Sequence, residues 1–140
     1  MQSDPGYLFD THALIWTIDD QPISAAAEAV ISAAAAMGQA IHVSPITAWE
    51  RGMLIAKGRL SSPLPPKTWF QKVVSSPQIA IAALTPEILT DASFLPPPLH
   101  GDPADRILIA TARAYDLTLI TRDRAILRYA AQGHVRAIAC

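Results

Sequence analysis

Short apolar runs recur along the chain, and each is followed by polar or turn-forming residues. Runs of this length, bounded by glycine, proline, serine or aspartate, are typical of buried strands. The runs cover Tyr7–Phe9, Ala40–Val43, Ile79–Leu84, Leu117–Ile120 and Val135–Ala139. The last run is expected at an edge of the sheet. The pattern therefore predicts four or five strands.

Helix signals fill the intervals between these runs. Ser24 is a candidate N-cap for an alanine-rich helix that Gly38 would end. Three capping side chains stand directly before a proline, which favours a helix start; these pairs are Ser44-Pro45, Thr85-Pro86 and Asp102-Pro103. The expected helices cover residues 11–18, 25–37, 45–57, 69–74, 86–94, 103–115 and 123–129.

The alternation of strands and helices predicts an α/β fold, with a parallel sheet that carries helices on both faces. The helix after Ser44 has Ile46, Trp49 and Met53 at positions i, i+3 and i+7. That spacing places the three side chains on one side of the helix, so we expect the stripe to face the core.

Composition agrees with a single globular domain. The chain has 140 residues, of which 51% are hydrophobic and 16% charged. We expect residues 1–6 to be a disordered lead and residues 7–140 to form one domain. No apolar run approaches the roughly 18 residues of a membrane span, so no membrane association is expected. The only cysteine is Cys140, which excludes a disulfide within the chain and favours a reducing cytoplasm.

Charge is distributed unevenly. Residues 1–105 contain 5 Lys and Arg against 10 Asp and Glu, whereas residues 106–140 contain 6 Arg and 2 Asp. A basic C-terminal third beside an acidic cluster could hold a polyanion. The alternative, which charge alone favours, is that these arginines lie on solvated helix faces.

Four carboxylates follow apolar runs or open helices: Asp10, Glu50, Asp105 and Asp123. In an open parallel sheet, ligands bind beyond the carboxyl ends of the strands. Acidic groups gathered there would repel one another unless a cation lay between them. Oxygen ligands suit Mg²⁺ or Mn²⁺. The pattern predicts a divalent-metal site that supports phosphodiester hydrolysis, with Asp10 as the central ligand.

Each acid also has a purely structural interpretation. Asp10, Asp102 and Asp123 could cap helices. Glu50 could pair with Arg51 or Lys57. Asp102 at the N-cap and Asp105 at N3 could both satisfy amides and interact favourably with the helix dipole. Capping is the favoured role of Asp102, while Asp105 is expected to point toward the strand ends.

The remaining candidate chemistry is weaker. We expect Thr11, Ser44, Asp102 and Thr121 to support the metal site, although Ser44 and Thr121 could equally be a cap and a turn residue. Arg106, Arg122 and His100 are candidate substrate-binding residues. The histidines show no ligand spacing, and Cys140 is expected to be exposed because it is the last residue.

Four segments together resemble the motifs of PIN-domain ribonucleases, specifically the VapC-type toxins of bacterial type II toxin–antitoxin pairs. They are Phe9–Trp16, Val43–Glu50, Gly101–Ala112 and Leu119–Asp123, and they occur in the order typical of that family. The resemblance runs from about Tyr7 to Val135. A proline at position 45 replaces the expected small residue, and the lead before the first strand is long.

The resemblance implies a three-layer α/β/α PIN-like fold with sheet order 3-2-1-4-5. It implies an endoribonuclease that cleaves RNA with a water activated by Mg²⁺ or Mn²⁺, and Asp10, Glu50, Asp105 and Asp123 as both the catalytic set and the metal ligands. It also implies a homodimer and a cognate antitoxin. We expect the antitoxin to cover the helices around Trp16 and Trp49–Leu54 and to contribute a basic residue to the acids.

Two other classes of function are compatible with such a fold. A phosphate-accepting receiver domain would need an acidic pair before the first helix and a lysine after a late strand, but Asp10 stands alone and Thr121-Arg122 occupies the later position. A non-catalytic interaction module would keep the fold and bind only a partner. Such a module has no need of four carboxylates.

Overall fold

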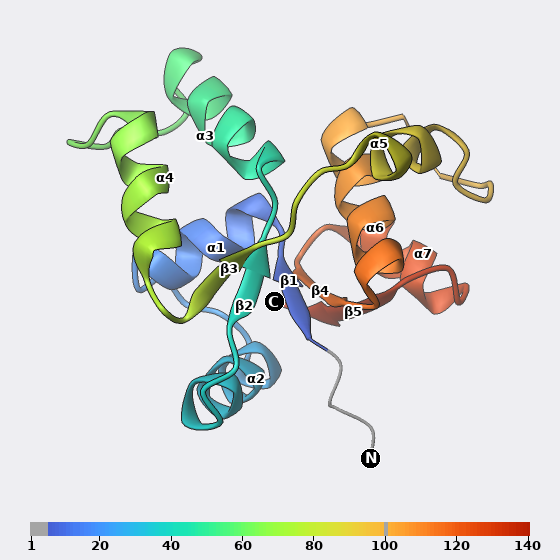
Figure 1. Ribbon diagram of the computed structural model, residues 1–140, viewed down its shortest axis with the longest axis horizontal. Helices are drawn as coiled ribbons and strands as arrows, with labels where there is room; N and C mark the ends of the chain where they lie inside the picture. Colours follow the sequence, from blue (N-terminus) through green and yellow to red (C-terminus); the bar gives the residue numbers. More distant parts are fainter. Residues whose placement is uncertain (1–5, 100) are drawn as a thin grey trace.

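The computed structural model describes residues 6–99 and 101–140, and its five strands form one parallel sheet (Figure 1). The spatial order is β3-β2-β1-β4-β5, which confirms the predicted order. Leu8 in the central strand pairs with His42 on one side and Leu119 on the other. The strands are β1 (Tyr7–Phe9), β2 (Ile41–Val43), β3 (Ile79–Ile81), β4 (Thr118–Thr121) and β5 (Arg136–Ala139).

Seven helices alternate with these strands in the described part of the chain: α1 (Thr11–Ile18), α2 (Ala25–Ala36), α3 (Ile46–Ala56), α4 (Pro66–Ser75), α5 (Pro86–Ser93), α6 (Pro103–Tyr115) and α7 (Arg124–Ala131). Helices α1, α2 and α4 share one apolar cluster with the sheet, and α5, α6 and α7 share another. Figure 1 shows these two groups on opposite sides of the strands, which confirms the three-layer prediction.

The predicted caps are present. Ser24 Oγ accepts a hydrogen bond from the Ala27 amide at 3.0 Å, and Thr85 Oγ1 accepts from the Ile88 amide at 3.2 Å. Gly38 follows α2 with a φ of 67°, a conformation that glycine adopts without steric cost. Helix α3 begins one residue later than expected, after Pro45, and Ser44 Oγ still accepts from the Ile46 amide at 3.1 Å.

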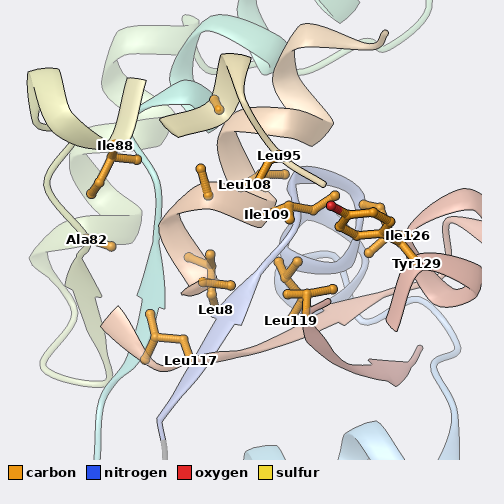
Figure 2. Packing of buried hydrophobic residues seen from close by; sticks show 14 residues of the cluster. Leu8, Ala82, Ile88, Leu95, Leu108, Ile109, Leu117, Leu119, Ile126 and Tyr129 are labelled. Carbon is orange, nitrogen blue, oxygen red and sulfur yellow. The ribbon is translucent and has the colours of Figure 1, made fainter. Parts of the chain in front are cut away.

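The larger apolar cluster lies between the sheet and α5, α6 and α7 (Figure 2). Leu8 and Leu119 of neighbouring strands meet Leu108 of α6 and Ile126 of α7, and all four are almost fully buried. Burial of such side chains contributes about 1.5–3 kcal/mol each, so this cluster fixes α6 and α7 firmly on the sheet.

Helix α3 departs from the prediction. The expected core stripe was Ile46, Trp49 and Met53, but Trp49 is 57% exposed, and the buried residues of α3 are Thr47 and Arg51. The helix contacts α1, α4 and α6 rather than lying flat on a face of the sheet. The buried side of α3 is therefore determined by polar and stacking contacts to neighbouring helices, namely Thr47 to Thr11 and Arg51 to Trp69. The spacing of apolar residues does not predict such contacts.

Most other boundaries differ from the prediction by one or two residues, and β3 and α4 differ by three. Strand β3 ends at Ile81, earlier than Leu84, although the Ala82 amide still donates to the Val43 carbonyl at 2.9 Å. Helix α4 spans Pro66–Ser75 and is longer than the expected 69–74, because Pro66 occupies its first turn, a position that suits proline.

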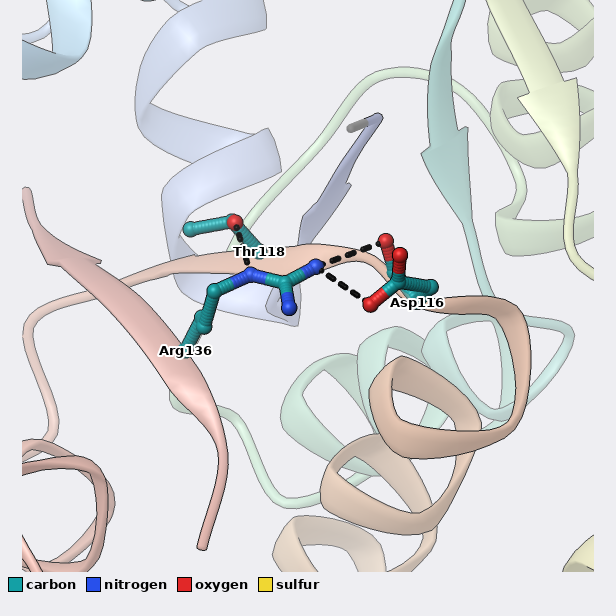
Figure 3. A network of polar contacts seen from close by, with 3 residues as sticks. All are labelled: Asp116, Thr118 and Arg136. Atoms are coloured by element: carbon teal, nitrogen blue, oxygen red, sulfur yellow. Dashed lines mark hydrogen bonds and ion pairs between the residues drawn. The ribbon is translucent and has the colours of Figure 1, made fainter. Parts of the chain in front are cut away.

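The arginines of the C-terminal third are not simply solvated. Arg136 donates from Nη2 to Asp116 Oδ1 at 2.7 Å and from Nε to Thr118 Oγ1 at 3.3 Å (Figure 3). Arg113 donates to the His134 carbonyl at 2.6 Å. These contacts join segments next to β4 and β5. Both arginines are exposed, and Arg113 lies on a helix face as expected, whereas Arg136 lies on strand β5.

Both ends of the described chain are hydrogen-bonded to β4. Residues 1–5 of the expected disordered lead lie outside the described residues, while the Gly6 carbonyl accepts from the Thr118 amide at 2.9 Å. Cys140 is buried, contrary to the expectation, because it packs in the cluster of α1, α2 and α4 and its amide donates to Thr121. Within the described ranges, no helix has the length and apolar character that crossing a bilayer requires.

Candidate active site

The four acids singled out by the sequence lie around one pocket of about 370 Å³ at the carboxyl edge of the sheet. Asp10 follows β1, Asp123 follows β4, and Glu50 and Asp105 come from α3 and α6. The pocket is lined by Asp10, Thr11, His12, Trp16, Glu50, Asp102, Asp105, Leu108, Arg122 and Asp123. The topology explains this gathering, because β1 and β4 are adjacent and α6 and α7 flank β4.

Asp10 is the most buried of the acids, with 8% of its surface exposed. Its Oδ1 accepts from the Ala13 amide at 2.7 Å, and Oδ2 accepts from the Thr121 hydroxyl. Burial raises the pKa of Asp10, and the bonds from Thr121 and Ala13 oppose that rise. Capping α1 and facing the pocket are therefore compatible, because an ionised carboxylate offers about four acceptor positions.

Thr121 connects two of the acids. Its hydroxyl donates to Asp10 and accepts from the Asp123 amide at 3.0 Å. Asp123 in turn caps α7, since Oδ1 accepts from the Ile126 amide at 3.0 Å. Thr121 is fully buried, so its orientation is fixed by these partners.

Glu50 is held by a threonine pair. Thr11 Oγ1 donates to Glu50 Oε1, and Thr47 Oγ1 lies 3.1 Å from Thr11 Oγ1. The Thr11 hydroxyl has one proton, which goes to Glu50, so Thr47 is the donor to Thr11. Burial raises the pKa of Glu50, and the Thr11 hydrogen bond opposes the rise.

The alternative pairing of Glu50 with Arg51 or Lys57 does not occur in the structure. The Arg51 guanidinium stacks on the Trp69 ring instead, with Cζ at 3.7 Å from the ring centroid. Thr47 was missed by the sequence analysis. A threonine inside a helix carries no signal by itself, and only its position three residues before Glu50 could have suggested a link.

Burial and neighbouring charges strongly perturb Asp105. Its pKa is raised to about 7, first by burial and then by the charges of Asp102, Asp123, Glu50 and Asp10. Asp102 caps α6, because its Oδ1 accepts from the Asp105 amide at 3.0 Å. The capping interpretation of Asp102 is thus observed, and Asp102 also lines the pocket.

Three other expected participants lie elsewhere or outside the described chain. Ser44 is fully buried and does not line the pocket; its hydroxyl accepts a hydrogen bond from the Ile46 amide at the start of α3. Arg106 Nε donates to the Ala92 carbonyl at 2.9 Å, which ties α6 to the end of α5. His100 lies outside the described residues.

The donor set suits a hard divalent cation, since carboxylate and hydroxyl oxygens line the pocket without a thiol. Across residues 6–99 and 101–140, however, no three Asp, Glu, His or Cys side chains converge tightly enough to enclose an ion. A divalent ion bound here would therefore have few protein ligands and would keep several of its waters. The arrangement of the acids fits less well with a closed, all-protein cage.

A separate pocket of about 370 Å³ lies between α1, α2 and α4. It is lined mainly by apolar side chains, among them Leu14, Ile31 and Trp69, and none of its lining residues is acidic. This apolar pocket therefore has no acidic side chain that could take part in the chemistry of the carboxylate pocket.

Comparisons with known proteins agree with the geometry. The PIN domain family model matches residues 7–132. The chain is 31% identical over 118 residues to Ribonuclease VapC22 of Mycobacterium tuberculosis, covering 84% of this chain and 86% of that protein. The crystal structure of VapBC2 from Rickettsia felis, bound to a DNA fragment from their promoter, is similar with a TM-score of 0.66 and 13% identity. That likeness covers 95% of this chain and 97% of the other, and at this identity it shows the fold alone.

Proposed function

Because the chain belongs to the PIN-domain family, we propose that it is the endoribonuclease toxin of a toxin–antitoxin pair and hydrolyses RNA phosphodiester bonds at the carboxylate pocket. The single observation that carries this proposal is the gathering of Asp10, Glu50, Asp102, Asp105 and Asp123 around one pocket. A non-catalytic interaction module would have no use for mutually repelling carboxylates at a buried site.

The raised pKa values support a cation in this pocket. Burial and neighbouring charges raise the pKa of Asp105 to about 7, so the acids disfavour one another's ionisation. A bound divalent ion would offset the repulsion between the carboxylates and so favour their ionised forms. Asp10 and Asp105 are the residues that we expect to hold Mg²⁺ or Mn²⁺, with Glu50 and Asp123 completing the set.

When bound, such an ion would lower the pKa of the attacking water and offset charge on the phosphate. The chain supplies the positioning. Thr121 orients Asp10, and Thr11 orients Glu50 through Oε1, which leaves Oε2 to accept a hydrogen bond from the attacking water. A water held in this way would attack the phosphorus in line and displace the ribose oxygen on the opposite side of the phosphate, and the proton that the water loses would pass through solvent to that leaving oxygen.

The partners follow from the same proposal. A cognate antitoxin would restrain the nuclease. The compartment would be the cytoplasm, because RNA substrates lie there and the one cysteine of the chain is buried and free. We also propose that the chain forms a homodimer.

The antitoxin is expected to cover part of α1 and α3. Trp49 is 57% exposed on α3, and Trp16 of α1 lines the pocket. Trp49 is the exposed anchor and Trp16 is partly buried; tryptophan suits this role because it is enriched among residues that dominate binding energy.

The test is cleavage of labelled RNA by the purified chain with Mg²⁺, with Mn²⁺ and with EDTA, beside Asp10→Asn. Asp19→Asn serves as the matched control, because Asp19 is exposed at the end of α1 and does not line the pocket. We expect metal-dependent cleavage that is lost in Asp10→Asn and retained in Asp19→Asn. Equal cleavage by Asp10→Asn, or cleavage that persists in EDTA, would refute the proposal.

A further inference from the structure

We infer that Arg122, Trp16 and His12 form a shelf that binds an unpaired nucleotide of the RNA beside the carboxylates. This inference rests on the proposed function, because it assigns a ligand to one wall of the same pocket. All three residues line the pocket, although they come from β4–α7 and from α1. We call them the basic-aromatic shelf.

The shelf consists of a stacked pair, Arg122 on Trp16, and of the His12 ring, which lies beside Trp16 at an angle. The Arg122 guanidinium lies over the Trp16 ring, with Cζ at 3.9 Å from the ring centroid. The His12 ring lies 5.8 Å from the Trp16 ring, centroid to centroid, with the planes tilted by 43°. His12 and Arg122 are exposed, so the two ends of the stack are open to a ligand.

Arg122 is held in place before any ligand arrives. Its Nε donates to the Cys140 carbonyl at 3.1 Å, and Nη2 donates to the Pro22 carbonyl at 3.1 Å. Those bonds and the Trp16 ring define both the plane and the direction of the guanidinium. They leave its Nη1 edge and its outer face for a ligand. A guanidinium fixed in this way loses little rotamer freedom on binding.

The charge of the pocket explains why this position matters. Five carboxylates line the pocket, and Arg122 is the one lysine or arginine among the lining residues in the described chain. An RNA strand that brings its phosphates to the acids is repelled by them wherever a cation does not intervene. Arg122 is the resident group of the chain that offers the opposite charge at the entrance.

The planes of the shelf indicate the kind of RNA. Proteins recognise single-stranded RNA by stacking bases on aromatic rings and on arginine planes, whereas paired bases are already stacked inside the helix. The outer face of Arg122 and the His12 ring provide such surfaces within the pocket. A single unpaired nucleotide next to the scissile phosphate is therefore the ligand that we assign to the shelf.

The binding experiment uses a labelled oligouridine and fluorescence anisotropy, with Ca²⁺ in place of Mg²⁺ so that the strand stays uncut. The probes are the oligouridine, the same backbone with abasic sites, and a duplex of equal length. The variants are Arg122→Lys, which keeps the charge but loses the plane, and His12→Gln. Arg128→Gln is the matched control, since Arg128 is an exposed arginine of α7 outside the pocket.

We expect Arg122→Lys to weaken oligouridine binding by about 5-fold or more, the fold-change that corresponds to loss of one base–side chain stacking contact. Arg128→Gln should change the affinity by less than about 2-fold, because it contributes only screened charge. The wild type should bind the oligouridine more tightly than the abasic strand or the duplex, and Arg122→Lys should reduce that preference.

Three results would overturn the inference. The first is an oligouridine affinity that is unchanged in both Arg122→Lys and His12→Gln. The second is a wild-type affinity for the abasic strand equal to that for the oligouridine, and the third is a wild-type affinity for the duplex equal to that for the oligouridine. Thermal unfolding of each variant checks the fold. Failure of the shelf is distinct from failure of the nuclease, because a wild type that cleaves RNA with metal while its shelf variants bind normally would refute the shelf alone.

Discussion

Threonine hydroxyls determine how individual carboxylates are presented to the pocket. Thr121 orients Asp10 and Thr11 orients Glu50, and each hydroxyl has a second partner that fixes its direction. Asp10, Glu50, Asp105 and Asp123 could be predicted from the sequence to lie near one another, because each follows an apolar run or lies in the first two turns of a helix. Thr47 could not, since its role depends on a contact with Thr11, 36 residues away.

Replacing Thr47 by valine removes the donor to Thr11 while keeping the side-chain shape. We expect the turnover number for RNA to fall by roughly 10-fold, the effect typical of losing an outer partner of a metal-site ligand. The Michaelis constant should stay unchanged, because Thr47 is fully buried and has no access to RNA. Steady-state kinetics of Thr47→Val and Thr47→Ser would test this. If the turnover number of Thr47→Ser were as low as that of Thr47→Val, the proposed chain of hydrogen bonds from Thr47 through Thr11 to Glu50 would be contradicted.

The pKa of Asp105 predicts how stability depends on pH in the metal-free protein. Because the folded pKa is about 7 and the ordinary value is 3.8, the folded state binds this proton more tightly than the unfolded state. Stability is therefore expected to rise as pH falls from about 7 toward 4, by less than the about 1.4 kcal/mol per pH unit of a fully buried group, because solvent screens the partly exposed Asp105.

Asp105→Asn should remove much of this dependence. In EDTA at pH 8, the variant is expected to have a larger free energy of unfolding than the wild type, because the buried charge is gone. At pH 4 the two should differ little. Urea denaturation at both values is the measurement, and a wild type that loses stability from pH 8 to pH 5 would contradict the sign.

At the scale of elements, local signals defined most helix starts. Ser24, Thr85 and Asp102 cap the helices that follow them, as expected from cap residues placed before alanine-rich or proline-led segments. Helix α3 was misjudged because its buried side is made by Thr47 and Arg51. Partners on α1 and α4 select those residues, and no pattern within α3 contains that information.

The cap of α6 connects an element to the site. Asp102→Ala and Asp102→Asn both remove the charge that raises the pKa of Asp105, but only asparagine keeps a capping oxygen. We expect the alanine variant to be less stable than the asparagine variant by about 1 kcal/mol. Urea denaturation at pH 5 in EDTA measures the difference. Equal stabilities would show that the Asp102 hydrogen bond to the Asp105 amide contributes nothing.

For the whole molecule, the alternation of strands and helices was enough to predict a parallel sheet with helices on both faces. The strand order came from the resemblance of the motifs, because residue patterns do not say which strands are neighbours. The exposure of Trp49 could be seen only in the folded chain, where α3 contacts helices of both layers.

Trp49 offers a test of the antitoxin surface. Trp49→Ala should weaken the complex with the cognate antitoxin by roughly 10-fold or more, as expected for a tryptophan anchor. Leu89→Ala is the control, because Leu89 is 44% exposed on α5, in the layer on the other side of the sheet. Titration of each variant with the antitoxin measures the change, and equal affinities for Trp49→Ala and the wild type would refute this surface.

The central claim is that one carboxylate pocket both binds a divalent ion and cleaves RNA. The most direct measurement is Mn²⁺ binding and RNA cleavage in the same titration, for the wild type and for the Asp10→Asn, Asp105→Asn double variant. We predict that cleavage rises with Mn²⁺ occupancy in the wild type, and that the variant loses both. Cleavage that is independent of Mn²⁺ occupancy, or a double variant that binds Mn²⁺ and cleaves like the wild type, would contradict the claim.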